Sequence, residues 1–175
     1  MAGDTDGTGR VTRTALVLTI SDGVAAGTRE DESGEALSVR LAELGFAVER
    51  QTVPDETDDI AMAVAKASGR VDLVVSTGGT GLGPRDRTPQ TLHGLLDYEI
   101  PGFGEQMRAY GRAVTPMADL SRSMAGALGA TLVIATPGSR GGALDSLMAV
   151  EAILEHALET LGGRTQHTDT HTEPG

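Results

Sequence analysis

Short apolar runs alternate with helical stretches along the chain, and this alternation limits the fold more than any other feature. The run Thr14-Ala-Leu-Val-Leu-Thr-Ile20 is continuous and rich in β-branched residues, as expected of a strand covered on both faces. Further strands are expected over residues 46–53, 71–76 and 130–135, with helices over 33–45, 57–68, 88–96, 101–112, 118–127 and 143–161. Such alternation predicts an α/β fold of three layers, in which helices cover both faces of a mostly parallel sheet.

A chain of 175 residues suits one domain with a buried core. We expect the α/β domain to occupy residues 14–161, after a flexible N-terminal segment over 1–13. Residues 162–175 are rich in Thr, His and Glu and are expected to form a disordered tail.

Composition and charge argue against several classes of protein. The absence of cysteine excludes disulfides, thiolate metal sites and cysteine nucleophiles. A net charge of −11 argues against a nucleic-acid surface, although local backbone amides can still bind an anionic small ligand. No apolar run approaches the ~18 residues that span a bilayer, and residues 1–13 lack the apolar segment of a secretory signal. We therefore expect a cytoplasmic protein with neither a nucleic-acid nor a membrane partner.

The loops that follow the four predicted strands indicate where a ligand binds. In parallel sheets, ligands bind beyond the carboxyl ends of the strands. Each loop there is rich in Gly, Pro, Ser, Thr or Asp: Ser21-Asp22-Gly23, Pro54-Asp55-Glu56, Thr77 to Arg87, and Thr136 to Gly142. The sequence therefore predicts a ligand site at this edge of the sheet.

The turn Thr77-Gly78-Gly79-Thr80-Gly81 is the strongest candidate for a phosphate cradle. Its glycines allow positive φ angles and a close approach of the ligand to backbone amides. It is not a Walker A loop, because no Gly-Lys-Ser/Thr follows, and it does not fit Gly-x-Gly-x-x-Gly. A plain tight turn is the alternative, but the preceding strand and the segment over 84–89 favour a phosphorylated ligand.

Acidic and basic residues accompany that turn. Asp86 lies between Arg85 and Arg87, so it can help bind Mg²⁺ while an arginine pairs with phosphate. An Asp86 that is simply ion-paired in a surface loop is the alternative interpretation. Asp55 precedes a helix and is expected to point into the cleft, whereas the acids at 58 and 59 suit the stabilisation of that helix's N-terminus.

Two other loops leave both a functional and a structural interpretation open. Ser21-Asp22-Gly23 is either a ligand-contacting turn or an ordinary Asp-Gly turn, and Pro137-Gly138-Ser139 is either an anion site or a helix cap. Covalent nucleophilic catalysis is disfavoured, because Gly-x-Ser-x-Gly is absent and no histidine falls in these loops.

The segment Thr77-Gly-Gly-Thr-Gly-Leu-Gly-Pro-Arg-Asp-Arg-Thr-Pro89 resembles the signature of the MogA/MoaB family of molybdenum cofactor biosynthesis proteins. Other matches occur in the family's order and extend the resemblance over about residues 14–161. They are Ile20-Ser-Asp-Gly23, Asp31-Glu-Ser-Gly34, Val53-Pro-Asp55, Ile100 to Arg108, Leu120-Ser-Arg122 and Thr136-Pro-Gly-Ser139.

The resemblance implies a molybdopterin-binding α/β fold, homotrimers or hexamers, and molybdopterin adenylyltransferase activity with Mg·ATP. In that reaction the molybdopterin phosphate attacks the α-phosphate of ATP, and adenylyl-molybdopterin and pyrophosphate are formed. Asp55 and Asp86 match the family's two essential aspartates, and Asp86 is also the candidate Mg²⁺ ligand. The substrate-binding candidates are Ser21, Asp22, Gly23, Thr77, Gly78, Gly79, Thr80, Gly81, Arg85, Thr88, Pro137, Gly138 and Ser139.

One motif departs from the family pattern. The family commonly continues Pro-Gly-Ser with Pro-Lys, whereas Arg140-Gly141-Gly142 follows here. The basic side chain therefore comes directly after the serine, and the two glycines give the backbone more conformational freedom. Two alternatives to the adenylyltransferase stay open. One is a MoaB-branch protein that binds molybdopterin without turnover, and the other is a nucleotide-hydrolysing relative of competence/damage-inducible proteins, which are usually longer.

Overall fold

A six-stranded sheet with the order β2-β1-β3-β6-β5-β4 forms the middle layer of the computed structural model, which describes residues 12–163. Strands β2, β1, β3 and β6 are parallel to one another, β5 is antiparallel to β6, and β4 is antiparallel to β5. The strands are β1 (Thr14–Ile20), β2 (Ala47–Val53), β3 (Leu73–Thr77), β4 (Tyr98–Glu99), β5 (Met124–Leu128) and β6 (Thr131–Thr136). The expectations for segments 1–13 and 162–175 fall almost wholly outside the described residues.

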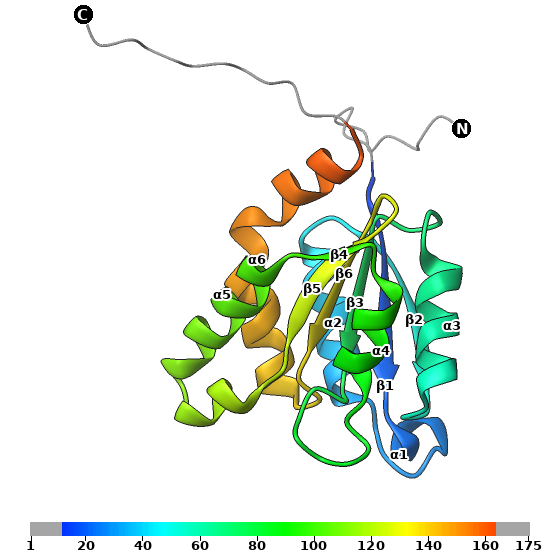
Figure 1. Ribbon diagram of the computed structural model, residues 1–175, viewed down its shortest axis with the longest axis vertical. Helices are drawn as coiled ribbons and strands as arrows, with labels where there is room; N and C mark the ends of the chain where they lie inside the picture. The colour runs from blue at the N-terminus through cyan, green and yellow to red at the C-terminus, as the bar shows by residue number, and fades with distance from the viewer. Residues whose placement is uncertain (1–11, 164–175) are drawn as a thin grey trace, which may run out of the picture.

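Helices cover both faces of this sheet (Figure 1). Buried residues of α2, α5 and α6 form one core cluster with the sheet, and those of α3 and α4 form a second on the opposite face. The helices are α1 (Asp22–Ala25), α2 (Glu32–Glu43), α3 (Thr57–Ala67), α4 (Thr88–Leu95), α5 (Pro101–Arg112) and α6 (Arg140–Leu161), with a 3₁₀ helix, η1 (Pro116–Leu120). The three-layer α/β prediction is confirmed.

Strand β1 shows why the apolar runs are continuous rather than alternating. Ala15 and Val17 belong to the core cluster beneath α2, α5 and α6, while Leu16 and Leu18 belong to the one beneath α3 and α4. All four are at most 1% exposed. A strand covered on both faces needs an apolar residue at every position, which is the pattern seen in the sequence.

The prediction of a helix over residues 118–127 is wrong. This segment contains the end of η1, an extended linker and most of β5, which pairs with β6 across a tight turn at Gly129, where φ is +58°. Alanine favours helix locally, but strand pairing with β6 and β4 outweighs that preference. A Cβ on Gly126 would lie 2.5 Å from the Tyr98 carbonyl oxygen, so this glycine serves close strand packing.

Two helix starts also differ from the prediction. Helix α2 begins at Glu32, one residue before the predicted start at 33, and its N-cap is Asp31, whose carboxylate accepts a hydrogen bond from the Gly34 N–H at 2.9 Å. Helix α6 begins at Arg140, three residues before the predicted start at 143, with Ser139 as its N-cap.

The four parallel strands end at one edge of the sheet, the lower edge in Figure 1. The chain leaves that edge after Ile20, Val53, Thr77 and Thr136, so the four loops singled out in the sequence lie at the same edge. Among residues 12–163, none of the helices has both the length and the apolar character needed to cross a bilayer.

Candidate functional site

A cavity of about 830 Å³ opens at the carboxyl edge of the parallel strands. This volume lies in the range of small-molecule and cofactor sites. Its wall includes most of the predicted site residues: Ser21, Asp55, Thr77, Gly78, Gly79, Thr80, Gly81, Asp86, Pro137, Gly138 and Ser139. The four other candidates, Asp22, Gly23, Arg85 and Thr88, lie beside or beneath that wall.

The glycine turn forms the floor between β3 and α4. Gly78 and Gly79 have φ angles of +107° and +66°, and a Cβ on either would overlap the Ile20 carbonyl oxygen or the Thr88 hydroxyl, respectively. The fully buried Thr88 donates from its hydroxyl to the Gly78 carbonyl at 2.9 Å and from its N–H to the Gly79 carbonyl at 3.1 Å. Thr88 therefore supports the turn from beneath.

The hydroxyl of Thr77 joins this turn to the loop after β6. It donates to the Pro137 carbonyl at 2.8 Å, and Thr77 is 1% exposed. The side chain that looked like a ligand donor in the sequence therefore fixes the spacing between two loops on the cavity wall.

Asp86 lies in the loop that follows the glycine turn, and a backbone N–H orients its carboxylate. Its Oδ2 accepts a hydrogen bond from the Gly83 N–H at 2.7 Å. A Cβ on Gly81 or Gly83 would come within 2.8 Å of that same oxygen, so glycine at both positions makes room for the carboxylate. Within residues 12–163, Oδ1 accepts no hydrogen bond, which leaves it for a ligand or a cation.

Asp55 is held in a reciprocal pair with Asp22. The Asp22 N–H donates to Asp55 Oδ2 at 2.8 Å, and the Asp55 N–H donates to Asp22 Oδ1 at 3.0 Å. The hydrogen bond from the Asp55 N–H is the largest cause of a lowered pKa at Asp22, and the hydrogen bond from the Arg85 side chain is the next. The pair ties the loops after β1 and β2 together and fixes the backbone that carries Asp55.

Arg85 spans from the loop after the glycine turn to those two loops. Its Nη2 lies 2.7 Å from Asp22 Oδ2, and its Nη1 lies 2.9 Å from Glu56 Oε1. Asp22 and then Glu56 raise the pKa of the Arg85 guanidinium. The arginine expected to bind phosphate is thus engaged with carboxylates in this structure.

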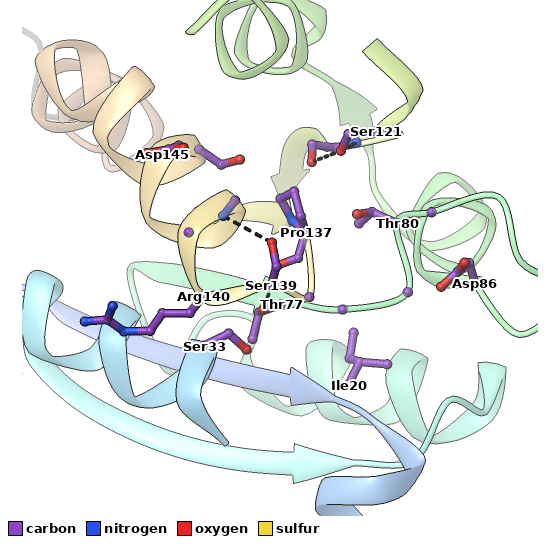
Figure 2. A pocket seen from close by; sticks show the side chains of 18 of the residues that line it. Ile20, Ser33, Thr77, Thr80, Asp86, Ser121, Pro137, Ser139, Arg140 and Asp145 are labelled. Atoms are coloured by element: carbon purple, nitrogen blue, oxygen red, sulfur yellow. Dashed lines mark hydrogen bonds between the residues drawn. The ribbon is translucent and has the colours of Figure 1, made fainter. Parts of the chain in front are cut away.

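Other cations line the cavity, and sequence reasoning assigned no site role to them. They are Arg29, Arg108 and Arg140. Figure 2 shows Arg140 and Asp86 on opposite sides of the cavity, with Ser139 and Pro137 between them. Arg108 falls in the motif from Ile100 to Arg108, which is the signal that points to it, whereas Arg29 lies in a polar loop without one.

An apolar wall completes the cavity and was also missed. Met107 on α5 and Val114, Met117 and Leu120 near η1 line it. Of these, Val114 is 70% exposed and Met117 61% exposed. Leu120 falls in the segment over 118–127 that was expected to be helical, and the other three lie in or beside α5 and η1, where an apolar side chain gives no local signal of a ligand site. The site thus combines a polar turn and carboxylates with an apolar side, as suits a ligand with a phosphate and a ring system.

Residues 16–159 match the family described as "Probable molybdopterin binding domain". The chain belongs to the MogA/MoaB family of molybdenum cofactor biosynthesis proteins. The match runs from within β1 to within α6 and includes every loop of the cavity wall.

Relatives within this family differ in length. The chain is 40% identical over 153 residues to the molybdenum cofactor biosynthesis bifunctional protein of Chlorobaculum tepidum, covering 86% of this chain and 49% of that protein. It therefore spans about half the length of that relative. The chain is also 36% identical over 154 residues to the molybdopterin adenylyltransferase of Helicobacter pylori, covering 84% of this chain and 86% of the relative.

Solved structures of the family share the fold. The molybdopterin biosynthesis enzyme MoaB of Thermus thermophilus superimposes with a TM-score of 0.79 at 42% identity, covering 87% of this chain and 98% of that one. The Mog protein of Mycobacterium ulcerans gives a TM-score of 0.81 at 34% identity, covering 86% of this chain and 99% of that one. The six-stranded, mostly parallel sheet is therefore the family fold.

Proposed function

We propose that this chain is a molybdopterin adenylyltransferase, which transfers the adenylyl group of Mg·ATP to the phosphate of molybdopterin. The observation that carries the proposal is that Asp55 and Asp86 line one cavity together with the glycine turn. Relatives from Helicobacter pylori and Pyrococcus furiosus are named molybdopterin adenylyltransferase, at 36% and 35% identity. The chain covers 86% and 90% of their lengths, so the comparison extends over nearly the whole of both proteins.

The chemistry of the transfer suits these residues. A phosphate oxygen of molybdopterin bonds to the α-phosphorus of ATP, the bond to the bridging oxygen of the β-phosphate breaks, and pyrophosphate leaves. Positioning and charge neutralisation accelerate such a displacement, and no side-chain nucleophile is required. Within residues 12–163, the Gly79 and Gly81 N–H groups donate to no protein acceptor, which leaves them for phosphate oxygens.

The donor set fits a magnesium ion that is shared with the nucleotide. Mg²⁺ takes one or two carboxylates together with waters and substrate phosphates. Asp86 offers its free Oδ1, and no group of three or more His, Asp or Glu gathers into a metal cluster in the described part of the chain. Asp86 is the residue that would hold the ion, and Asp55 lines the same cavity. An ion bound there would neutralise phosphate charge and orient the triphosphate.

The test is a product assay on the purified chain with molybdopterin and Mg·ATP. We expect adenylyl-molybdopterin and pyrophosphate in equal amounts, with no pyrophosphate when molybdopterin is left out. Tight pterin binding without pyrophosphate would instead support a molybdopterin-binding protein without turnover. ATP hydrolysis without pterin would contradict both.

We also propose that the chain assembles as a homotrimer or as a hexamer built from two trimers. The molecular mass of the native protein, measured by mass spectrometry under non-denaturing conditions, tests this proposal. A monomeric mass at micromolar concentration would contradict it.

A further inference from the structure

Arg122, in the linker between η1 and β5, holds the loop that carries Asp86. Its backbone N–H donates to the Thr80 carbonyl at 2.9 Å. Its Nε donates to the Gly81 carbonyl at 2.8 Å, and its Nη2 donates to the Asp86 carbonyl at 2.6 Å. One residue therefore binds the loop at three points, from a segment that is distant in sequence.

The guanidinium joins the two ends of this loop. The Gly81 and Asp86 carbonyls lie at its start and finish, so one planar group that donates to both fixes the distance between them. Inside the loop, the Asp86 N–H donates to the Gly83 carbonyl at 3.0 Å, and the Gly83 N–H donates back to Asp86 Oδ2 at 2.7 Å. Arg122 thus holds the backbone of Asp86, while Gly83 aims its carboxylate into the cavity.

The segment that carries Arg122 is itself anchored. Arg108 on α5 donates from Nη1 to the Ser123 carbonyl at 2.9 Å, and the hydroxyls of Ser121 and Ser123 lie 2.7 Å apart. Ser123 is 3% exposed. Arg122 is not among the residues that line the cavity, so it acts on the loop and not on the ligand.

We propose that Arg122 is a positioning residue for adenylyl transfer, which keeps the Asp86 carboxylate in its reactive place without contacting substrate. The proposal rests on the function proposed above. Because a misplacement of about 1 Å in an active site can cost about 100-fold in rate, loss of this clamp should lower kcat far more than it alters substrate binding.

The experiment compares Arg122→Ala and Arg122→Lys with Arg112→Ala. Arg112 is the matched control, because its exposed ion pair with Asp119 at 2.7 Å lies outside the cavity wall. We expect Arg122→Ala to lose about 100-fold in kcat, with a much smaller change in the KM for ATP. Lysine should restore little, because an ammonium is a point charge without the planar fork that reaches two carbonyls. Millimolar ethylguanidinium should partly restore the alanine variant.

A second measurement does not depend on turnover. Hydrogen exchange of a peptide over residues 80–88 should accelerate in Arg122→Ala and stay unchanged in Arg112→Ala, because the Arg122 clamp holds that loop. Unchanged exchange, or a kcat close to wild type, would overturn the proposal. Loss of activity without rescue by ethylguanidinium would reduce Arg122 to a purely structural role and would also overturn it. A wild-type chain that forms no adenylyl-molybdopterin would refute the proposed function while the exchange result still decides the clamp.

Discussion

Replacement of Thr88 by valine tests whether the glycine turn is held in shape from beneath. Valine keeps the shape of threonine but removes the hydroxyl that donates to the Gly78 carbonyl at 2.9 Å. Because Thr88 is 0% exposed, no bulk water replaces the lost donor, and an unsatisfied buried carbonyl costs about 1–3 kcal/mol. In a domain of this size, each kcal/mol lowers Tm by roughly 2–4 °C.

Thr131→Val provides a matched control at the other end of the sheet. Thr131 is 1% exposed, and its hydroxyl donates to the Val71 carbonyl at 2.8 Å and accepts from the Gly69 N–H at 2.9 Å. The same chemical change there should lower Tm at least as much, since it removes two hydrogen bonds. It lies at the start of β6, away from the cavity, so it should leave ligand binding unaltered.

The assay pairs thermal unfolding with calorimetric titration of Mg·ATP. We expect both variants to unfold at lower temperature, and only Thr88→Val to bind Mg·ATP more weakly, by roughly tenfold, the equivalent of about 1.4 kcal/mol. Equal affinities for Mg·ATP in the two variants would refute the role assigned to Thr88 beneath the turn.

Two further predictions concern the backbone of the glycine turn and the loss of stability at acid pH. Gly78→Ala should lower the free energy of unfolding in urea by at least about 1–3 kcal/mol, because φ is +107° and the new Cβ would overlap the Ile20 carbonyl oxygen. An unchanged midpoint of urea unfolding would contradict this prediction. Burial raises the pKa of Asp31, but hydrogen bonds led by the one from Arg50 outweigh it, so the pKa falls below its ordinary 3.8. The ionised Asp31 carboxylate therefore stabilises the fold at pH values above 3.8, and this stabilisation is lost as the pH falls through the lowered pKa. In urea unfolding measured at several pH values, Asp31→Asn should lose less of its free energy of unfolding on acidification than wild type does.

Three of the four parallel strands were predictable because burial on both faces leaves a local signal in the sequence. The predicted boundaries of β1 match the structure, and those of β2, β3 and β6 differ by at most two residues. Strands β1, β3 and β6 are buried runs that end in a polar or glycine-rich loop, whereas β2 is a mostly exposed edge strand that was recognised from its alternation and from the Pro54-Asp55 turn that follows it. Strand β5 was not predictable from local pattern. Its alanines and Gly126 favour no strand on their own, and only pairing with β4 and β6 determines its conformation.

The functional site was likewise predictable only in part. The glycine turn, Asp55 and Asp86 follow strand ends, so their place at one edge of the sheet could be predicted. The partners of Arg85 could not, because Asp22 and Glu56 follow other strands and reach it only in three dimensions. The clamp from Arg122 likewise depends on contacts between segments far apart in sequence.

Single-turnover adenylylation by Asp86→Asn shows whether adenylyl transfer depends on the Asp86 carboxylate. Asp58→Asn is the matched control, because Asp58 is an exposed acid in the first turn of α3 and lies outside the cavity wall. With radiolabel in the α-phosphate of ATP, we expect wild type and Asp58→Asn to transfer label to molybdopterin. Asp86→Asn should transfer it at least about 100-fold more slowly while it still binds molybdopterin. Transfer by Asp86→Asn at the wild-type rate, with the same dependence on Mg²⁺, would show that this carboxylate has no part in the reaction.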